Sequence, residues 1–215
     1  LKKLNANGDS VAVFNDVKKY GNPDYVDVTN PLKSLLYYKN YSTVVTLDRL
    51  LTVRNTINLR KQNIFYVNTV TLSYDNYMWL FDEEDFRLKK IDEEGKILQS
   101  STDWRMLFDS VPAPVKIIDR DNYVYLYDPA KGFYIFDYYG GFKNRLAFLN
   151  WTNVEVNGTT VYGFEETKLY SYQLKSLQLK EYKLPAFFGK YISIKAMNGL
   201  VYLLNENGVD IYRIR

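Results

Sequence analysis

The sequence contains no cysteine and no histidine among its 215 residues. Without thiols or imidazoles, these residues cannot form disulfides, bind a metal through thiolate or imidazole ligands, or use a nucleophile activated by histidine. Catalysis would have to depend on carboxylates, lysine, tyrosine or serine. We assign no catalytic residue, no cofactor and no metal site from the sequence.

Glycine, proline and clustered charge are also scarce. The 11 glycines and 6 prolines are too few for a collagen-like or linker-rich chain. The net charge of +3 is spread over short basic pairs such as Lys18-Lys19 and Lys89-Lys90, whereas nucleic-acid binding usually needs a denser basic patch. Apolar runs such as residues 123–127 are far shorter than the roughly 20 residues of a membrane-spanning helix. We therefore expect no nucleic-acid partner and no direct membrane span.

Aromatic residues are abundant, and they recur in a repeated phrase. The chain has 21 Tyr, 12 Phe and 3 Trp, a composition that favours β-strands. Residues 75–82 (Asp-Asn-Tyr-Met-Trp-Leu-Phe-Asp) recur as residues 121–128 (Asp-Asn-Tyr-Val-Tyr-Leu-Tyr-Asp), and weaker copies begin near Ser34, Asn157 and Asn198. A turn that tolerates positive φ opens most copies, and a strand buried on both faces follows.

The spacing of these copies predicts the fold. The aligned positions Leu36, Leu80, Leu126, Gly163 and Leu203 are 44, 46, 37 and 40 residues apart. A strand-only repeat of this length is typical of a β-propeller blade. A β-sandwich also has closely spaced short strands, but it gives no reason for the same phrase to recur. We predict an all-β chain that forms a β-propeller of five to six four-stranded blades.

The expected repeat units divide residues 1–215, a single domain, into six segments: 1–25, 26–66, 67–111, 112–153, 154–189 and 190–215. The first blade is expected to be incomplete, because residues 1–15 resemble only the second half of a blade. We favour a six-bladed ring with further strands upstream of Leu1. Only residues 103–110 are expected to form a helical turn or two, before Pro112 and Pro114.

Several acidic residues near the expected strand starts are candidates for channel carboxylates, namely Asp27, Asp75, Asp119 and Asp121. Asp75 and Asp121 occupy the same place in the repeat, which favours a turn role over a catalytic one. Residues 82–85 lack the alternating pattern of a calcium loop and are interpreted as a solvated hairpin tip. The alternative function left open is a carbohydrate-active or sugar-binding propeller that uses channel carboxylates and aromatic side chains.

A surplus of aromatic side chains falls in predicted turns. These rings either pack against blade edges or serve as contacts for a partner protein, for which Tyr, Trp and Phe are well suited. The candidate partner contacts are Tyr138, Tyr139, Phe142, Trp151, Phe187 and Phe188.

Two longer segments, residues 28–48 and 88–97, carry a family resemblance. The chain resembles a family of small secreted propeller-like proteins of Bacteroidota. The resemblance implies a removed signal peptide and a periplasmic location in association with the outer membrane. It also implies a role similar to that of accessory subunits of outer-membrane machines, among them the plug-like subunit of the type 9 secretion translocon.

The resemblance carries no catalytic motif. We therefore expect a non-enzymatic periplasmic interaction module. Its expected partner is an outer-membrane protein complex, such as a large protein-secretion translocon or barrel.

Overall fold

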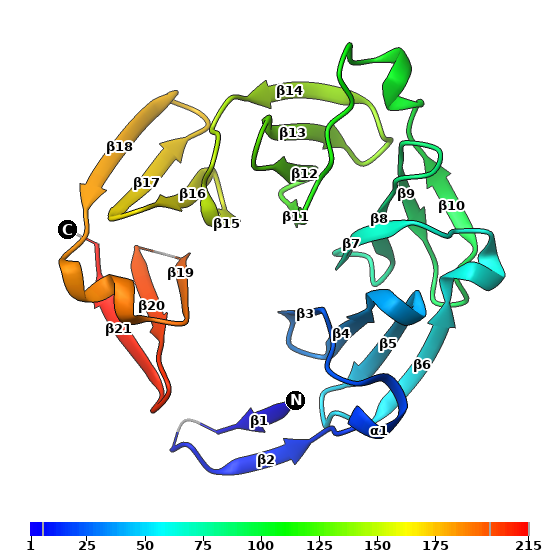
Figure 1. Ribbon diagram of the computed structural model, residues 1–215, viewed down its shortest axis with the longest axis horizontal. Helices are drawn as coiled ribbons and strands as arrows, with labels where there is room; N and C mark the ends of the chain where they lie inside the picture. The colour runs from blue at the N-terminus through cyan, green and yellow to red at the C-terminus, as the bar shows by residue number, and fades with distance from the viewer. Residues whose placement is uncertain (6, 198, 215) are drawn as a thin grey trace.

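The computed structural model describes residues 1–5, 7–197 and 199–214. Six antiparallel sheets stand around a central axis, each a meander of consecutive strands (Figure 1). Among the described residues, four sheets have four strands, one has three and one has two. The predicted all-β propeller is thereby confirmed, and we call the sheets blades 1 to 6 in chain order.

The blades have the following strands. Blade 1 is β1 (Lys2–Leu4) and β2 (Ser10–Val13). Blade 2 is β3 (Tyr25–Asn30), β4 (Lys33–Tyr38), β5 (Thr43–Asp48) and β6 (Val53–Asn58). Blade 3 is β7 (Val67–Leu72), β8 (Met78–Asp82), β9 (Arg87–Ile91) and β10 (Ile97–Ser100). Blade 4 is β11 (Lys116–Arg120), β12 (Tyr123–Asp128), β13 (Gly132–Asp137) and β14 (Phe142–Leu146).

Blade 5 is β15 (Thr152–Asn157), β16 (Thr160–Glu165), β17 (Lys168–Gln173) and β18 (Gln178–Lys183). Blade 6 is β19 (Ser193–Met197), β20 (Leu200–Leu204) and β21 (Val209–Arg213). Helical segments are short: α1 (Val17–Tyr20), η1 (Lys39–Tyr41), η2 (Leu59–Gln62), η3 (Trp104–Met106) and η4 (Ala186–Lys190). The helical turn expected within residues 103–110 is the single turn η3, but the expectation that helix would be confined to this segment is wrong, because four other short helical turns form in the connections. No helix in the described part of the chain is long and apolar enough to cross a membrane.

The hydrophobic core lies between neighbouring blades. Successive side chains of a strand point to opposite faces of its sheet, so the second strand of each blade supplies two interfaces. In β8, Met78 and Leu80 pack against blade 2, whereas Trp79 and Phe81 pack against blade 4. This double burial explains why the repeated phrase is almost continuously apolar, with no polar alternation.

The predicted turns and one exception to the repeat both have a steric cause. Asn76 and Asn122 precede the second strands with φ of 68° and 67°, a left-handed conformation that Asn tolerates. At the aligned position Gly163, a Cβ atom would lie only 2.2 Å from Cε3 of Trp151. Trp151 therefore fills the space that leucine occupies in the aligned copies.

A second repeat, which the sequence analysis missed, closes the turn between the third and fourth strands. The last residue of β5, Asp48, accepts hydrogen bonds at Oδ1 from the backbone N–H groups of Leu50 and Thr52, at 2.8 and 2.9 Å. Asp92 and Asp137 accept the same pair of bonds from the residues two and four positions later.

Asn5 accepts this pair of bonds as well, from the N–H groups of Asn7 and Asp9. The β1–β2 hairpin thus has the geometry of a third and fourth strand, as predicted for residues 1–15. Ala12 and Phe14 pack against blade 2, where a neighbouring blade would pack. At the other end of the ring, β21 pairs with β20 on one side, and no other described strand pairs with it.

Candidate functional site

The first strands of blades 2 to 6 (β3, β7, β11, β15 and β19) surround the centre of the ring (Figure 1). Between them is a hollow of about 590 Å³, lined by both apolar and charged side chains. Two of the predicted carboxylates, Asp27 and Asp119, line this hollow, and Glu155, which the sequence analysis did not single out, joins them. The hollow therefore contains the side chains that any acid–base chemistry in the channel would use.

Asp27 connects blade 2 to blade 3. Its side chain is only 2% exposed. Oδ2 accepts hydrogen bonds from Thr71 Oγ1 at 2.7 Å and from the backbone N–H of Leu72 at 2.8 Å, both in blade 3. Oδ1 accepts two more from the backbone N–H and hydroxyl of Thr29, at 2.8 and 2.7 Å. With four donors around it, this carboxylate links blade 2 to blade 3 through hydrogen bonds.

Asp119 makes the corresponding connection from blade 4 back to blade 3. Oδ2 accepts hydrogen bonds from Ser73 Oγ at 2.8 Å and Trp79 Nε1 at 3.0 Å, and the Tyr138 hydroxyl donates to Oδ1. Burial raises the pKa of Asp119 above its ordinary value, although these three hydrogen bonds and the charge of Lys90 oppose the shift. Burial and the adjacent Asp119 carboxylate also raise the pKa of Tyr138.

Glu155 is paired with two lysines from neighbouring inner strands. Its Oε1 lies 3.0 Å from Lys116 Nζ and 3.1 Å from Lys195 Nζ. The three channel carboxylates are thus engaged in hydrogen bonds or ion pairs. A glycosidase of the two-carboxylate type needs one protonated acid and one free carboxylate or nucleophile facing the substrate.

The other two predicted carboxylates lie in turns. Asp75 forms an ion pair with Lys90 and accepts a long hydrogen bond, 3.4 Å, from the backbone N–H of Tyr77. Asp121 is exposed and has a φ of 50° in the β11–β12 turn. This arrangement agrees with the turn role that the repeat favoured for both residues.

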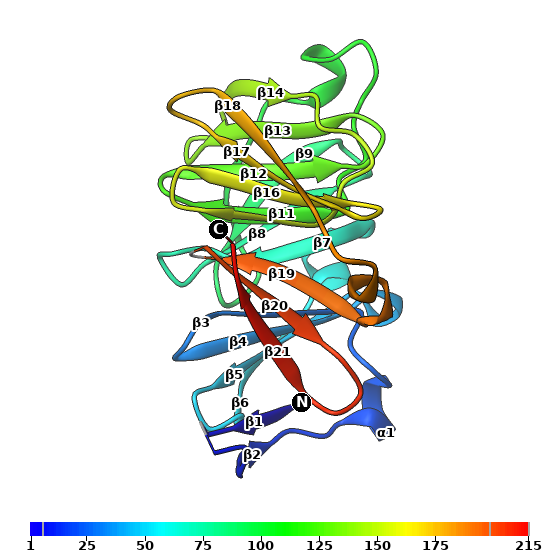
Figure 2. The same cartoon turned by 90° about the vertical axis from the view of Figure 1, so that its left-hand side faces the viewer.

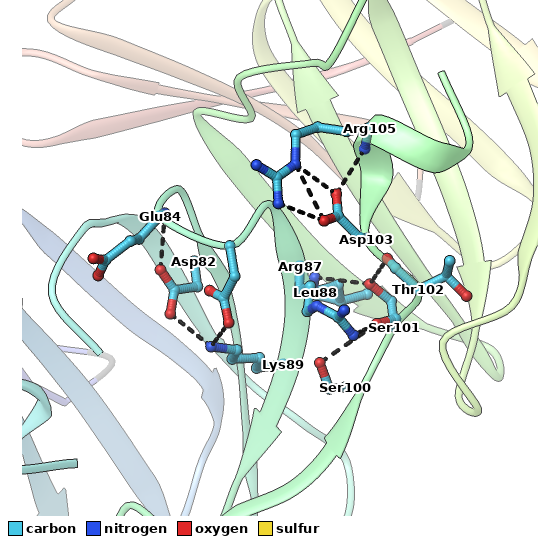
Figure 3. Close-up of polar contacts among 11 residues, drawn as sticks. Asp82, Glu84, Arg87, Leu88, Lys89, Ser100, Ser101, Thr102, Asp103 and Arg105 are labelled. Atoms are coloured by element: carbon cyan, nitrogen blue, oxygen red, sulfur yellow. Dashed lines mark hydrogen bonds and ion pairs between the residues drawn. The ribbon is translucent and has the colours of Figure 1, made fainter. Parts of the chain in front are cut away.

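A polar cluster at the β8–β9 hairpin of blade 3 joins these two strands (Figure 3). Lys89 Nζ lies 2.7 Å from Asp82 Oδ2 and 2.7 Å from Asp85 Oδ2. Asp82 is fully buried, so our interpretation of residues 82–85 as a solvated hairpin tip is wrong for this residue. Its partner Lys89 is buried with it. Within the described residues, no three acidic side chains are grouped as a metal site would require.

Beside this cluster, Ser101 Oγ accepts a hydrogen bond from the backbone N–H of Leu88 at 3.0 Å, and its carbonyl accepts one from Arg87 (Figure 3). Arg105 pairs with Asp103 next to it. These contacts tie the connection after β10 to blade 3, so their role is structural.

Three adjacent hairpin loops of blades 3 and 4 gather tyrosines on one face of the ring. We call this surface the tyrosine face; it comprises residues 73–77, 120–123 and 137–141, with Tyr74, Tyr77, Tyr123, Tyr138 and Tyr139. Tyr74 and Tyr139 are 69% and 87% exposed. The Tyr74 and Tyr138 rings stack with centroids 4.9 Å apart and planes 10° apart. Tyr123 pairs across the strands with Asp137, which brings the last two loops side by side.

Lys90 lies beneath these rings. Its Nζ is 5.0 Å from the Trp79 ring centroid and 5.4 to 5.7 Å from the centroids of Tyr74, Tyr77 and Tyr138. Cation–π attraction and the Asp75 ion pair hold the lysine there. The loops are therefore supported from below by a nearly buried charge.

The six aromatic residues predicted as partner contacts separate into two groups. Tyr139, Phe142 and Phe187 are exposed, and Tyr138 is half-buried within the tyrosine face. Trp151 and Phe188 are buried in the interfaces between blades, where Trp151 stacks between Phe148 and Tyr170. For these two, the packing interpretation that the sequence left open describes the structure.

The residues predicted as partner contacts do not form a single site. Phe187 and Phe188 border an apolar hollow of about 370 Å³ between blades 5 and 6, remote in the ring from the loops of blade 4. Tyr74 and Tyr77, which the sequence analysis did not nominate, join Tyr138 and Tyr139 instead. Tyr74 and Tyr77 fall in the turn after the first strand of their repeat unit, and this position is the sequence feature that could have identified them.

No protein-family model matches the sequence, and no curated protein matches it. Solved structures with the same fold do match. A streptogramin B lyase has a TM-score of 0.65 at 12% identity, over 99% of this chain and 75% of that chain. A catalytically inactive histidine-to-alanine variant of virginiamycin B lyase from Staphylococcus aureus, solved with quinupristin, has a TM-score of 0.63 at 12% identity, over 99% and 76%.

BamB from Moraxella catarrhalis is similar with a TM-score of 0.54 at 11% identity, over 96% of this chain and 62% of that chain. At such identities the likeness establishes the β-propeller fold, and function has to be argued from the site itself.

Proposed function

We propose that the protein is a non-enzymatic interaction module that docks on an outer-membrane protein complex in the periplasm, such as a protein-secretion translocon. The observation that carries the proposal is the contrast between the channel and the tyrosine face. The channel carboxylates are engaged in holding blades together, whereas Tyr74 and Tyr139 are exposed on supported loops. Aromatic side chains of this kind are frequent anchors of protein interfaces.

The comparisons bear on catalysis through one residue only. The virginiamycin B lyase variant that lacks one histidine is catalytically inactive, and the present 215 residues contain no histidine. The same chemistry would need a different residue here. The periplasmic location rests on the resemblance to secreted propeller-like proteins of Bacteroidota, and fractionation of the native source would test it directly.

The experiment for the docking role is cross-linking in cells followed by purification in mild detergent. We expect the tagged protein to co-purify with an integral outer-membrane protein in a fixed ratio. After the complex is dissociated, the tagged protein should be recovered alone. Recovery of only free monomer from intact, cross-linked membranes would refute the proposal. A cytoplasmic location would refute its periplasmic part.

One observation favours the carbohydrate alternative: the central hollow combines Tyr25 and Tyr202 with the charged residues Lys116 and Glu155. Sugars commonly bind to aromatic rings flanked by polar groups. A glycan array with the purified protein would test this function, and a Glu155→Gln variant would show whether any binding involves the channel.

A further inference from the structure

We propose that the tyrosine face binds an arginine-bearing segment of the partner protein. This inference rests on the proposed docking role and names the surface and the chemistry of what it contacts. The composition of the three loops is the first argument. Residues 73–77, 120–123 and 137–141 contain Tyr, Asn, Asp, Ser, Gly and a single Arg. Antibody paratopes use a similar mixture of rigid tyrosines with small adaptable polar residues to bind proteins.

The Tyr74 and Tyr138 rings are held in place before any partner arrives. Tyr138 is fixed by its hydrogen bond to Asp119, Tyr74 stacks on Tyr138, and Lys90 lies beneath both rings. The backbone N–H of Tyr139 is bonded to Asp137 Oδ1 at 2.9 Å, which fixes its turn. Binding to side chains that are already ordered costs less conformational entropy than binding to mobile ones.

Exposed carboxylates in and beside the tyrosine face favour a cationic partner group. Together with the adjacent loop 92–96, residues 73–77, 120–123 and 137–143 contain six acidic and three basic side chains, on a chain whose net charge is +3. Lys33 and Lys90 from neighbouring strands pair with Glu93 and Asp75. Asp137 is paired with Lys143, and Arg54 lies near Glu93. Asp121 and Glu94 are exposed without an ion pair among the described residues.

Arginine fits these groups better than lysine does. Its planar guanidinium can stack on an exposed tyrosine ring and donate paired hydrogen bonds to a carboxylate at the same time. Tyr74 and Tyr139 offer exposed rings, and Asp121 offers an exposed carboxylate in the β11–β12 loop of the same face. Lysine provides the same charge without the planar donor fork, so the geometry discriminates between the two.

Short Gly-Ser peptides with alternating arginines, lysines or citrullines are suitable probes, and binding to the purified protein is measured by calorimetry at low and physiological salt. We expect the arginine peptide to bind about tenfold more tightly than the lysine peptide, and the citrulline peptide to bind least. Equal affinity of the arginine and lysine peptides would overturn the proposal, since it would show simple charge attraction.

Variants locate the binding to the surface. The double variant Tyr74→Ala/Tyr139→Ala should weaken the arginine peptide about tenfold, and Asp121→Asn should weaken it by a smaller factor. Tyr66→Ala is the matched control, because Tyr66 is 64% exposed and lies in the connection between blades 2 and 3. Since all these side chains are exposed, circular dichroism should show unchanged folding. A Tyr66→Ala loss as large as that of the double variant would exclude the tyrosine face.

The cellular experiment separates this inference from the docking role. If the outer-membrane partner is still recovered with Tyr74→Ala/Tyr139→Ala, docking stands and the tyrosine face is not its site. If no partner is recovered with the unmodified protein either, docking itself fails. Loss of the partner with the double variant but not with Tyr66→Ala supports both.

Discussion

The two interfaces of blade 3 and the interface between blades 5 and 6 are held together by different polar contacts. Asp27 and Asp119 approach blade 3 from opposite neighbours and bind consecutive residues at the end of β7 and just beyond it, Thr71 to Ser73. Between blades 5 and 6, the corresponding polar contact is the Lys195–Glu155 ion pair, whose lysine side chain is 47% exposed. A buried carboxylate, Asp27, and a partly buried one, Asp119, thus have neutral donors, whereas the contact between blades 5 and 6 is an ion pair with a half-exposed lysine.

This difference bears on where a binding surface can be placed. The tyrosine face lies on the loops of blades 3 and 4, immediately above the Asp119 hydrogen bonds (Figure 2 shows the ring edge-on, with hairpin turns on two opposite faces). A site keeps its geometry when packing and supporting hydrogen bonds fix its side chains, as stacking and the Asp119 bond fix Tyr74 and Tyr138. Blade 6 has three described strands, and its last strand, β21, is exposed along its length.

Removal of the Asp27 carboxylate should have the largest effect on stability. In Asp27→Ala, the Thr71 hydroxyl and the backbone N–H group of Leu72 lose their acceptor in a buried site, and Thr29 loses part-buried hydrogen bonds. Each unsatisfied buried donor costs about 1–3 kcal/mol, so we expect the free energy of unfolding to fall by about 4 kcal/mol. Urea denaturation measures the change. Asp121→Asn, in an exposed turn, is the control and should change little.

A smaller loss is expected where the leucine repeat is interrupted. Gly163→Ala places a Cβ atom against the Trp151 ring, and overpacking of this kind costs about 2 kcal/mol. Trp151→Ala alone leaves a cavity. In the double variant the new Cβ has room, so the two losses should be less than additive in urea denaturation. Strict additivity would show that Trp151 does not occupy the space of the missing side chain.

The pH dependence of stability should reveal the burial of Asp119. Because the folded pKa is raised above its ordinary value of 3.8, the protonated form is favoured by folding. The resulting stability is fully present below pH 3.8 and is lost as pH rises through the raised folded pKa. Relative to Asp119→Asn, the unmodified protein should therefore become less stable as pH increases across this interval. Urea midpoints at several pH values test the sign, and a difference that grows in the opposite direction would contradict it.

The sequence predicted the architecture because its repeat has a direct physical cause. The second strand of each blade packs on two neighbours, so an apolar phrase had to recur with its turn, and the copies at residues 75–82 and 121–128 revealed it. The turn role of Asp75 follows from the same periodicity. The repeat also contained the Asp48, Asp92 and Asp137 turns, 44 and 45 residues apart, which went unnoticed.

The contacts between blades were harder to predict. Asp27 and Asp119 reach donors that lie more than forty residues away in the chain, and a local pattern does not show which donor a carboxylate will meet. Trp151 and Phe188 were nominated from turn-like sequence, but the space left by Gly163 and the interface with blade 6 bury them. Pairing partners across blades are set by the ring, which the local sequence does not encode.

The smallest effect should come from the junction between blades 5 and 6. Lys195→Ala removes one of the two cations bound to Glu155 and leaves Lys116 in place, 3.0 Å from the carboxylate. Because an exposed ion pair contributes about 0.5 kcal/mol and is screened by salt, the free energy of unfolding should fall by no more than this amount. The difference from the unmodified protein should vanish in concentrated salt, whereas the Asp27→Ala loss should persist. A Lys195→Ala loss as large as that of Asp27→Ala would mean that both junctions are fastened with equal strength.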